Sequence, residues 1–96
     1  MPAMTYMLRW PDASQTIAYS PSLVIQDYFA PGSSYALPVF MEKLREATGI
    51  ANERVKAKFG FACSRASDQL EAIEAEARRF SDLPEARVDV LSFGPA

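Results

Sequence analysis

The sequence predicts a two-layer α+β domain in which about three helices cover one face of a small three-stranded sheet. Three observations lead to this fold class. Apolar and polar residues alternate in the first part of the chain, apolar residues recur at spacings of three and four in the middle, and a short apolar run closes the chain. The 96 residues contain no repeat and no low-complexity tract, so residues 1–96 are expected to form a single domain.

A β-hairpin is predicted for the first nineteen residues. Apolar side chains at every second position from Met4 to Trp10 indicate a half-buried strand. Residues 11–13 (Pro-Asp-Ala) are typical of a turn, and Ser14–Tyr19 is the returning strand. A glycine would suit position 13 better if the loop needs a left-handed residue there, because alanine in that conformation costs about 1–2 kcal/mol.

A short helix is predicted to follow the hairpin. Ser20 and Pro21 combine a hydroxyl N-cap with a proline at the first helical position. The helix is expected to run to Tyr28 and to end at Ala-Pro-Gly, residues 30–32. We expect a connecting loop from there to about Ala36.

Two long helices come next. The apolar stripe of residues 38–59 passes through Gly49 without losing phase, which predicts one helix, and Gly60 supplies a left-handed stop. The second helix is expected over residues 64–80. The apolar residues that define the two stripes are Phe40, Leu44, Ala47, Ala51, Val55 and Phe59, followed by Ala66, Leu70, Ile73, Ala77 and Phe80.

The last strand is predicted over Arg87–Phe93. Met7 on the first strand, together with Leu91 and Phe93 on the last, indicates that the sheet face away from the helices is partly apolar. A bare sheet face of this kind is often an oligomer interface, so we expect a homodimer.

Composition excludes several classes of chemistry. The chain has no histidine and one cysteine, so the usual zinc, haem and iron–sulfur ligand sets cannot be assembled within it. A Ser–His–Asp or Cys–His pair is excluded for the same reason. We therefore expect no metal and no cofactor, and we favour a protein that is not an enzyme.

Charge, hydropathy and cysteine content indicate the class of partner and the cellular compartment. The formal charge of −2 and the pI near 5.0 argue against nucleic acid as a partner. No run approaches the roughly 20 apolar residues of a membrane span, and the first residues do not resemble a secretory signal. The lone cysteine fits a reducing compartment, so a cytoplasmic location is expected.

Cys63 is the weak candidate for a catalytic residue. It precedes the helix predicted from Ser64, where the helix dipole and the neighbouring Arg65 would lower the pKa of its thiol. The functional interpretation is a nucleophile or a redox-sensitive thiol. The structural interpretation, which we favour, is a buried cysteine in the apolar run that enters this helix.

Arg54, Lys58 and Arg65 are the candidates for anion binding. With Lys56 they belong to a basic series, and Arg54 and Lys58 share one helix face because they are four residues apart. Beside the free N–H groups at the start of the next helix they could hold a phosphate or a carboxylate. The alternative, which we favour, is a solvated helix face.

Five runs of residues resemble one small bacterial family. They are RWPD at 9–12, YSPSLV at 19–24, DYF at 27–29, ERVKAKFGFACS at 53–64 and DQL at 68–70. The family is that of the nitrogen-starvation response proteins, whose genes cluster with a nitrilase and other enzymes. The resemblance implies that the protein is expressed under nitrogen limitation, together with enzymes that process nitriles or amides. It implies no established reaction and no established binding site.

The leading hypothesis is therefore a non-enzymatic accessory protein of nitrogen-starvation metabolism. It would bind an enzyme encoded in the cluster, such as the nitrilase, or a small metabolite. The alternatives are a thiol-dependent enzyme or carrier that uses Cys63, and a sensor of a nitrogen metabolite.

Overall fold

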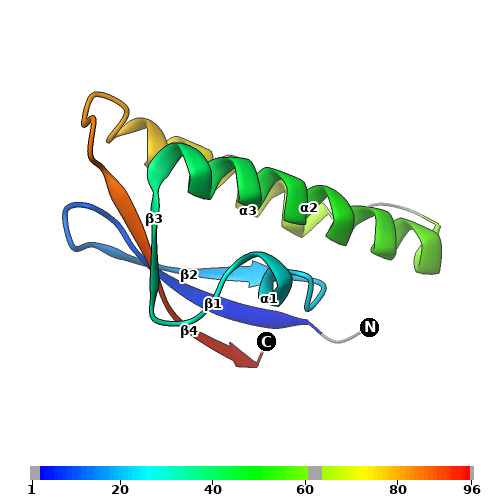
Figure 1. Ribbon diagram of the computed structural model, residues 1–96. Helices are drawn as coiled ribbons and strands as arrows, with labels where there is room; N and C mark the ends of the chain where they lie inside the picture. The colour runs from blue at the N-terminus through cyan, green and yellow to red at the C-terminus, as the bar shows by residue number, and fades with distance from the viewer. Residues whose placement is uncertain (1–2, 61–63, 96) are drawn as a thin grey trace.

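The computed structural model describes residues 3–60 and 64–95 of the chain (Figure 1). It contains a four-stranded antiparallel sheet and three helices, which confirms the α+β fold class. In chain order the elements are β1 (Met4–Arg9), β2 (Gln15–Ser20), α1 (Ile25–Tyr28), β3 (Ser33–Ala36), α2 (Leu37–Phe59), α3 (Ser64–Arg78) and β4 (Arg87–Pro95).

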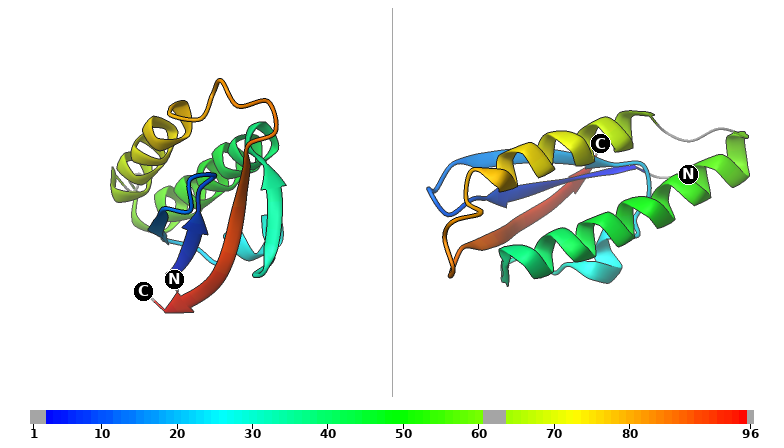
Figure 2. Two further views of the ribbon diagram at one scale, coloured as in Figure 1. Left: turned by 90° about the vertical axis from the view of Figure 1, so that its left-hand side faces the viewer. Right: turned by 90° about the horizontal axis from the view of Figure 1, so that it is seen from above.

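The sheet has the strand order β2-β1-β4-β3, so the last strand of the chain lies between β1 and β3. The predicted hairpin is present, with β1 and β2 paired from Met4↔Ser20 to Arg9↔Gln15. Helices α2 and α3 lie side by side over one face of the sheet and leave the opposite face, here called the outer face, uncovered (Figures 1 and 2).

The prediction of three strands was wrong, because the segment expected as a loop contains β3. This strand pairs with β4 from Ser33↔Val90 to Ala36↔Arg87. Its sequence, SSYA, lacks the apolar alternation that marks a strand, and its only large apolar group is the ring of Tyr35. That ring meets the ring of Phe29 edge to face at 5.2 Å, so tertiary contacts hold a segment with little strand signal of its own.

The hydrophobic core lies between α2, α3 and the inner face of the sheet. Leu8, Val88 and Val90 from the two central strands are fully buried, as are Phe40 and Leu44 of α2. The other buried residues of the two predicted stripes are Ala47, Ala51 and Val55 in α2, Ala66, Ile73 and Ala77 in α3, and Phe80 after α3. The alternation and the helical spacing therefore identified most of the core correctly.

The short helix begins later than predicted. Ser20 is the last residue of β2, and its hydroxyl donates to the carbonyl of Ser22 at 2.6 Å instead of capping a helix. The hydroxyl oxygen of Ser22 then accepts the backbone N–H of Val24 at 3.3 Å. These two local bonds make a turn, and α1 is a single four-residue turn of helix after it.

The two long helices are close to the prediction. Helix α2 continues unbroken through Gly49 and ends at Phe59, and the next residue, Gly60, has a φ of 83° and is the expected left-handed stop. Phe59 departs from the predicted stripe, since 54% of it is exposed. Helix α3 ends at Arg78, so Phe80 is buried from the turn after the helix. None of the helices in residues 3–60 and 64–95 is long and apolar enough to cross a membrane.

A β-bulge at Leu91 corrects the prediction for the outer face. Met7 pairs with Ser92 while the next residue, Leu8, pairs with Val90, so Leu91 is the extra residue on β4. Side chains along a strand alternate between the two faces of the sheet, so one inserted residue moves every following side chain to the opposite face. Phe93 consequently packs against the core and does not lie on the outer face.

Candidate functional site

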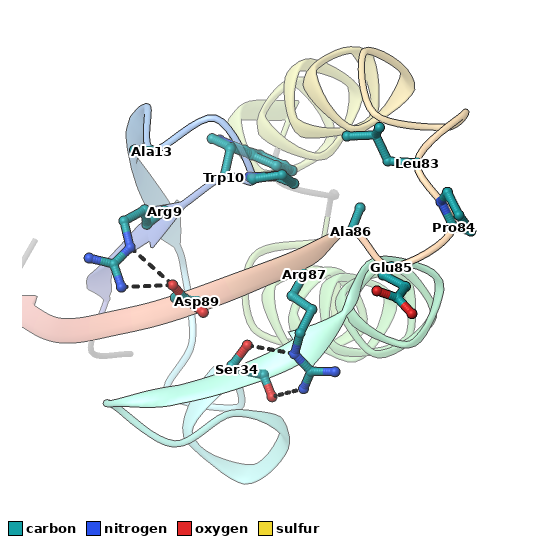
Figure 3. A pocket seen from close by; sticks show the side chains of 11 residues that line it. Arg9, Trp10, Ala13, Ser34, Leu83, Pro84, Glu85, Ala86, Arg87 and Asp89 are labelled. Carbon is teal, nitrogen blue, oxygen red and sulfur yellow. Dashed lines mark hydrogen bonds and ion pairs between the residues drawn. The ribbon is translucent and has the colours of Figure 1, made fainter.

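A groove with a volume of about 610 Å³ lies at the end of the sheet where β1 finishes and β4 begins (Figure 3). Its walls come from three separate parts of the chain: the end of β1 with the turn that follows, β3, and the loop 83–86 that leads into β4. The volume is in the range of small-molecule binding sites, which is roughly 300–1,000 Å³. We call this feature the sheet-end groove.

The turn on one side of the groove is held by local hydrogen bonds. The backbone N–H of Trp10 donates to the carbonyl of Ser14 at 2.8 Å, and that of Ala13 donates to the carbonyl of Trp10 at 2.9 Å. Ser14 and Arg79 also donate to the carboxylate of Asp12. The bonds from Ser14 lower the pKa of Asp12, with a smaller effect of Arg79. Ala13 has a φ of 69°, so the left-handed residue considered for this turn is present.

An apolar wall forms the inner side of the groove. The indole of Trp10 is 2% exposed, stacks on the ring of Phe80 at 6.0 Å, and donates from Nε1 to the hydroxyl of Thr16 at 2.9 Å. Ala86 is anchored to α2, because its carbonyl accepts the backbone N–H of Leu37 at 3.0 Å. The wall is therefore fixed by the core and by the start of α2.

A charged row on the outer face forms the other side. Arg9, Asp89 and Ser34 stand opposite one another on β1, β4 and β3. Arg9 donates from Nε and Nη2 to Asp89 Oδ2, at 3.0 and 2.8 Å (Figure 3). These bonds lower the pKa of Asp89, and Ser34 and the charge of Arg87 lower it further. Asp89 therefore remains a carboxylate in the folded protein at neutral pH.

Arg87 and Glu85 complete the polar lining of the groove. Arg87 lies on β4 two residues before Asp89 and donates to Ser34, from Nε to the hydroxyl and from Nη2 to the carbonyl, both at 2.9 Å. These bonds fix the guanidinium beside the groove (Figure 3). Glu85 stands in the loop two residues earlier and is exposed.

The arrangement is suited to binding. An apolar wall facing a few fixed charged groups is the usual design of a small-ligand site, where the apolar part supplies affinity and the polar groups set orientation. The carboxylate in the charged row is engaged by an arginine and its pKa is lowered, whereas a general acid or base at neutral pH needs a carboxyl pKa that is raised.

Each of the three predicted anion-binding residues contacts a different side chain of the protein. Arg54 donates from Nη1 to the hydroxyl of Ser22 at 3.0 Å. The guanidinium of Arg65 lies 3.9 Å from the ring centre of Tyr19, and the ammonium of Lys58 lies 5.6 Å from the ring centre of Phe59. Arg54 and Arg65 thus both contact the segment 19–22, while Lys58 sits near the end of α2. Anion binding by these residues stays a prediction.

Cys63, the candidate nucleophile, lies outside the described residues, so its interpretation also stays a prediction. Within residues 3–60 and 64–95, no three acidic or cysteine side chains gather in a way that could hold a metal ion.

The outer face of the sheet carries a small apolar cluster beside the charged row. Met7 and Ile17 stand directly opposite each other on β1 and β2, and Ile17 is 66% exposed. Leu91 at the bulge is half-buried on the neighbouring strand β4. We call Met7, Ile17 and Leu91 the outer-face cluster. Of the predicted apolar residues on this face, Met7 and Leu91 are there, and Phe93 is not.

The sequence runs that suggested a nitrogen-starvation protein now have places in the fold. Three residues of RWPD at 9–12 line the sheet-end groove. YSPSLV at 19–24 covers the end of β2 and the turn after it, which contact Arg65 and Arg54. The family model of the nitrogen starvation-induced protein NitG matches residues 5–93. No curated protein and no solved structure is significantly similar to the chain. Because the match covers nearly the whole fold, from β1 to β4, the chain belongs to the family of the nitrogen starvation-induced protein NitG.

Proposed function

We propose that this member of the NitG family is a non-enzymatic accessory protein of the nitrogen-starvation response, and that it acts by binding a small metabolite in the sheet-end groove. The observation that carries the proposal is the groove itself. Its exposed apolar lining comes from Pro11, Leu83 and Pro84, with the buried Trp10 behind them. The charged row of Arg9, Asp89 and Ser34 stands on the other side. The family supplies the cellular context. The chain has no histidine, which removes the commonest general base.

Thermal unfolding with candidate metabolites tests this proposal. A ligand that binds only the native state raises the melting temperature, so one member of a panel of nitriles, amides, amino acids and nucleotides is expected to do so. Leu83→Arg, which places a long charged side chain in the mouth of the groove, is expected to abolish that shift. Glu71→Gln on the exposed side of α3 is the matched surface control and should leave it intact. A shift that survives Leu83→Arg contradicts the assignment of the groove.

The outer-face cluster favours a second function, the docking of a protein. One backbone group on each edge strand is already engaged, because Gln69 accepts the N–H of Tyr19 on β2 and Arg87 donates to the carbonyl of Ser34 on β3. A strand added at an edge would have to compete with these bonds, whereas the exposed Ile17 makes the outer face the surface that we assign to a partner. The expected partners are an enzyme of the same gene cluster, such as the nitrilase, or a second copy of the chain.

Purified components distinguish these two partners. Sedimentation of the protein alone reports a homodimer, and sedimentation after mixing with the nitrilase reports the complex. In either case Ile17→Lys should abolish association, because it puts a charge at the most exposed position of the cluster. Glu71→Gln again serves as the control. Association that persists in Ile17→Lys rules out the outer face as the docking surface.

A further inference from the structure

We propose that the ligand of the sheet-end groove is a zwitterionic amino acid, whose carboxylate binds Arg87, whose ammonium binds Glu85, and whose apolar side chain lies along Leu83 and Pro84. This inference rests on the proposed function, because it names the chemical class of the metabolite that the groove would hold.

The charges of the groove point to a ligand that carries both signs. Four charged side chains line it, and two of them, Arg9 and Asp89, neutralise each other in an ion pair of 2.8 Å. The other two are Arg87 and Glu85, and neither makes an ion pair within the part of the chain that the structure describes. One cation and one anion are thus left over in a groove whose lining is formally neutral.

The two remaining charges line the same groove, and one of them is held in place by hydrogen bonds. Arg87 and Glu85 are two residues apart, and both line the same groove. Ser34 binds Nε and Nη2 of Arg87, while Nη1 donates no hydrogen bond to any residue in 3–60 or 64–95. Because Ser34 already holds the guanidinium, binding a carboxylate costs little further side-chain entropy. The remaining N–H groups of Arg87 can then donate to that carboxylate.

The apolar wall begins next to these charges. Leu83 and Pro84 precede Glu85 in the same loop, and Leu83 is 51% exposed although it is a large aliphatic residue (Figure 3). An apolar ligand side chain laid on Leu83 would bury this surface, with the wall of Trp10 behind it. The groove therefore offers an apolar surface, an anion and a cation together, which are the three kinds of contact that the side chain, ammonium and carboxylate of one amino acid can make.

Nuclear magnetic resonance titration with three related probes tests the inference. The probes are L-phenylalanine, 3-phenylpropanoate, which lacks the ammonium, and 2-phenylethylamine, which lacks the carboxylate. We expect L-phenylalanine to shift the amide signals of residues 83–87 and to bind at least about tenfold more tightly than either analogue, since each charge-assisted hydrogen bond is worth that much.

Two substitutions assign the ends of the ligand. Glu85→Gln, at an exposed residue, is expected to weaken L-phenylalanine and 2-phenylethylamine about tenfold and to leave 3-phenylpropanoate unchanged. Arg87→Gln should weaken L-phenylalanine and 3-phenylpropanoate instead. Because Arg87 also binds Ser34, Arg87→Lys is added, which keeps the charge and should retain part of the affinity. Glu71→Gln is the control in each titration.

The possible results separate three statements: the zwitterion assignment, the ligand class and the proposed binding function of the groove. If 3-phenylpropanoate binds as tightly as L-phenylalanine, or if Glu85→Gln leaves the affinity for L-phenylalanine within twofold, the zwitterion assignment is wrong while binding in the groove stands. If none of the three probes binds but a nitrile, amide or nucleotide shifts the same amides, the ligand class is wrong and the proposed function stands. If nothing in either panel shifts residues 83–87, both are wrong.

Discussion

Ala13 offers the sharpest test of the turn that builds one side of the groove. Its φ of 69° makes it the one non-glycine residue with a left-handed backbone among residues 3–60 and 64–95. Its N–H donates to the carbonyl of Trp10 at 2.9 Å, which closes the turn, and its side chain is exposed. Ala13→Gly therefore removes a methyl group that packs against little and releases a strained backbone.

The expected gain follows from two opposing terms. An L-residue in the left-handed region costs about 1–2 kcal/mol, and glycine does not bear that cost. Glycine also makes the unfolded chain more flexible, which lowers stability by about 0.4–1 kcal/mol. The two ranges combine to a net stabilisation of about 0–1.6 kcal/mol for Ala13→Gly, centred at about 0.8 kcal/mol. For a domain of this length, the central value raises the melting temperature by about 3–6 °C.

Thermal and urea unfolding followed by circular dichroism measure this change. Ala72→Gly is the matched control, because it makes the same chemical change at an exposed alanine inside α3. There glycine is unfavourable, and we expect a loss of about 1 kcal/mol. The two variants should thus move the midpoint in opposite directions. A loss of stability in Ala13→Gly similar to that in Ala72→Gly would refute the left-handed turn.

Three further predictions concern a helix, a charge and the thiol. Gly49→Ala should raise stability by about 1 kcal/mol, measured by urea unfolding, because Gly49 is exposed inside α2 and a Cβ there meets nothing within 4 Å. Asp89→Asn should destabilise the protein at pH 7, and urea midpoints should show that difference shrinking as the pH falls through the lowered pKa of Asp89, where wild type loses the same stabilisation. Cys63 should react with iodoacetamide at pH 6 only after unfolding; rapid labelling of the folded protein would favour the thiol-dependent enzyme or carrier.

Much of the fold could be predicted because its signals are local. The alternation from Met4 to Leu8 and the long stripe of α2 are each contained in one stretch of sequence, and Gly60 marks a helix end by itself. β3 was missed because its position depends on partners far away in the sequence. It is held by its pairing with β4 and by the packing of Tyr35, and neither can be read from SSYA alone.

The bulge and the groove depend even more on long-range geometry. A single unpaired residue, Leu91, reverses the side on which Phe93 lies, and nothing in the local sequence marks it. Arg9 and Asp89 are 80 residues apart, so their ion pair is invisible until the register of β1 with β4 is known. The available signal was that Arg9 and Asp89 are charged residues at positions of opposite parity to the buried Leu8 and Val90, which places them on the side away from the core.

We propose that this NitG-family protein binds a metabolite and does not transform it, and one experiment can follow both properties at once. The most direct measurement records amide spectra of the labelled protein together with the signals of an added metabolite over several hours. We expect saturable shifts confined to the groove residues 9–13, 34 and 83–89, while the total amount of free and bound metabolite stays constant. Steady consumption of the metabolite, abolished by Cys63→Ser, would contradict it.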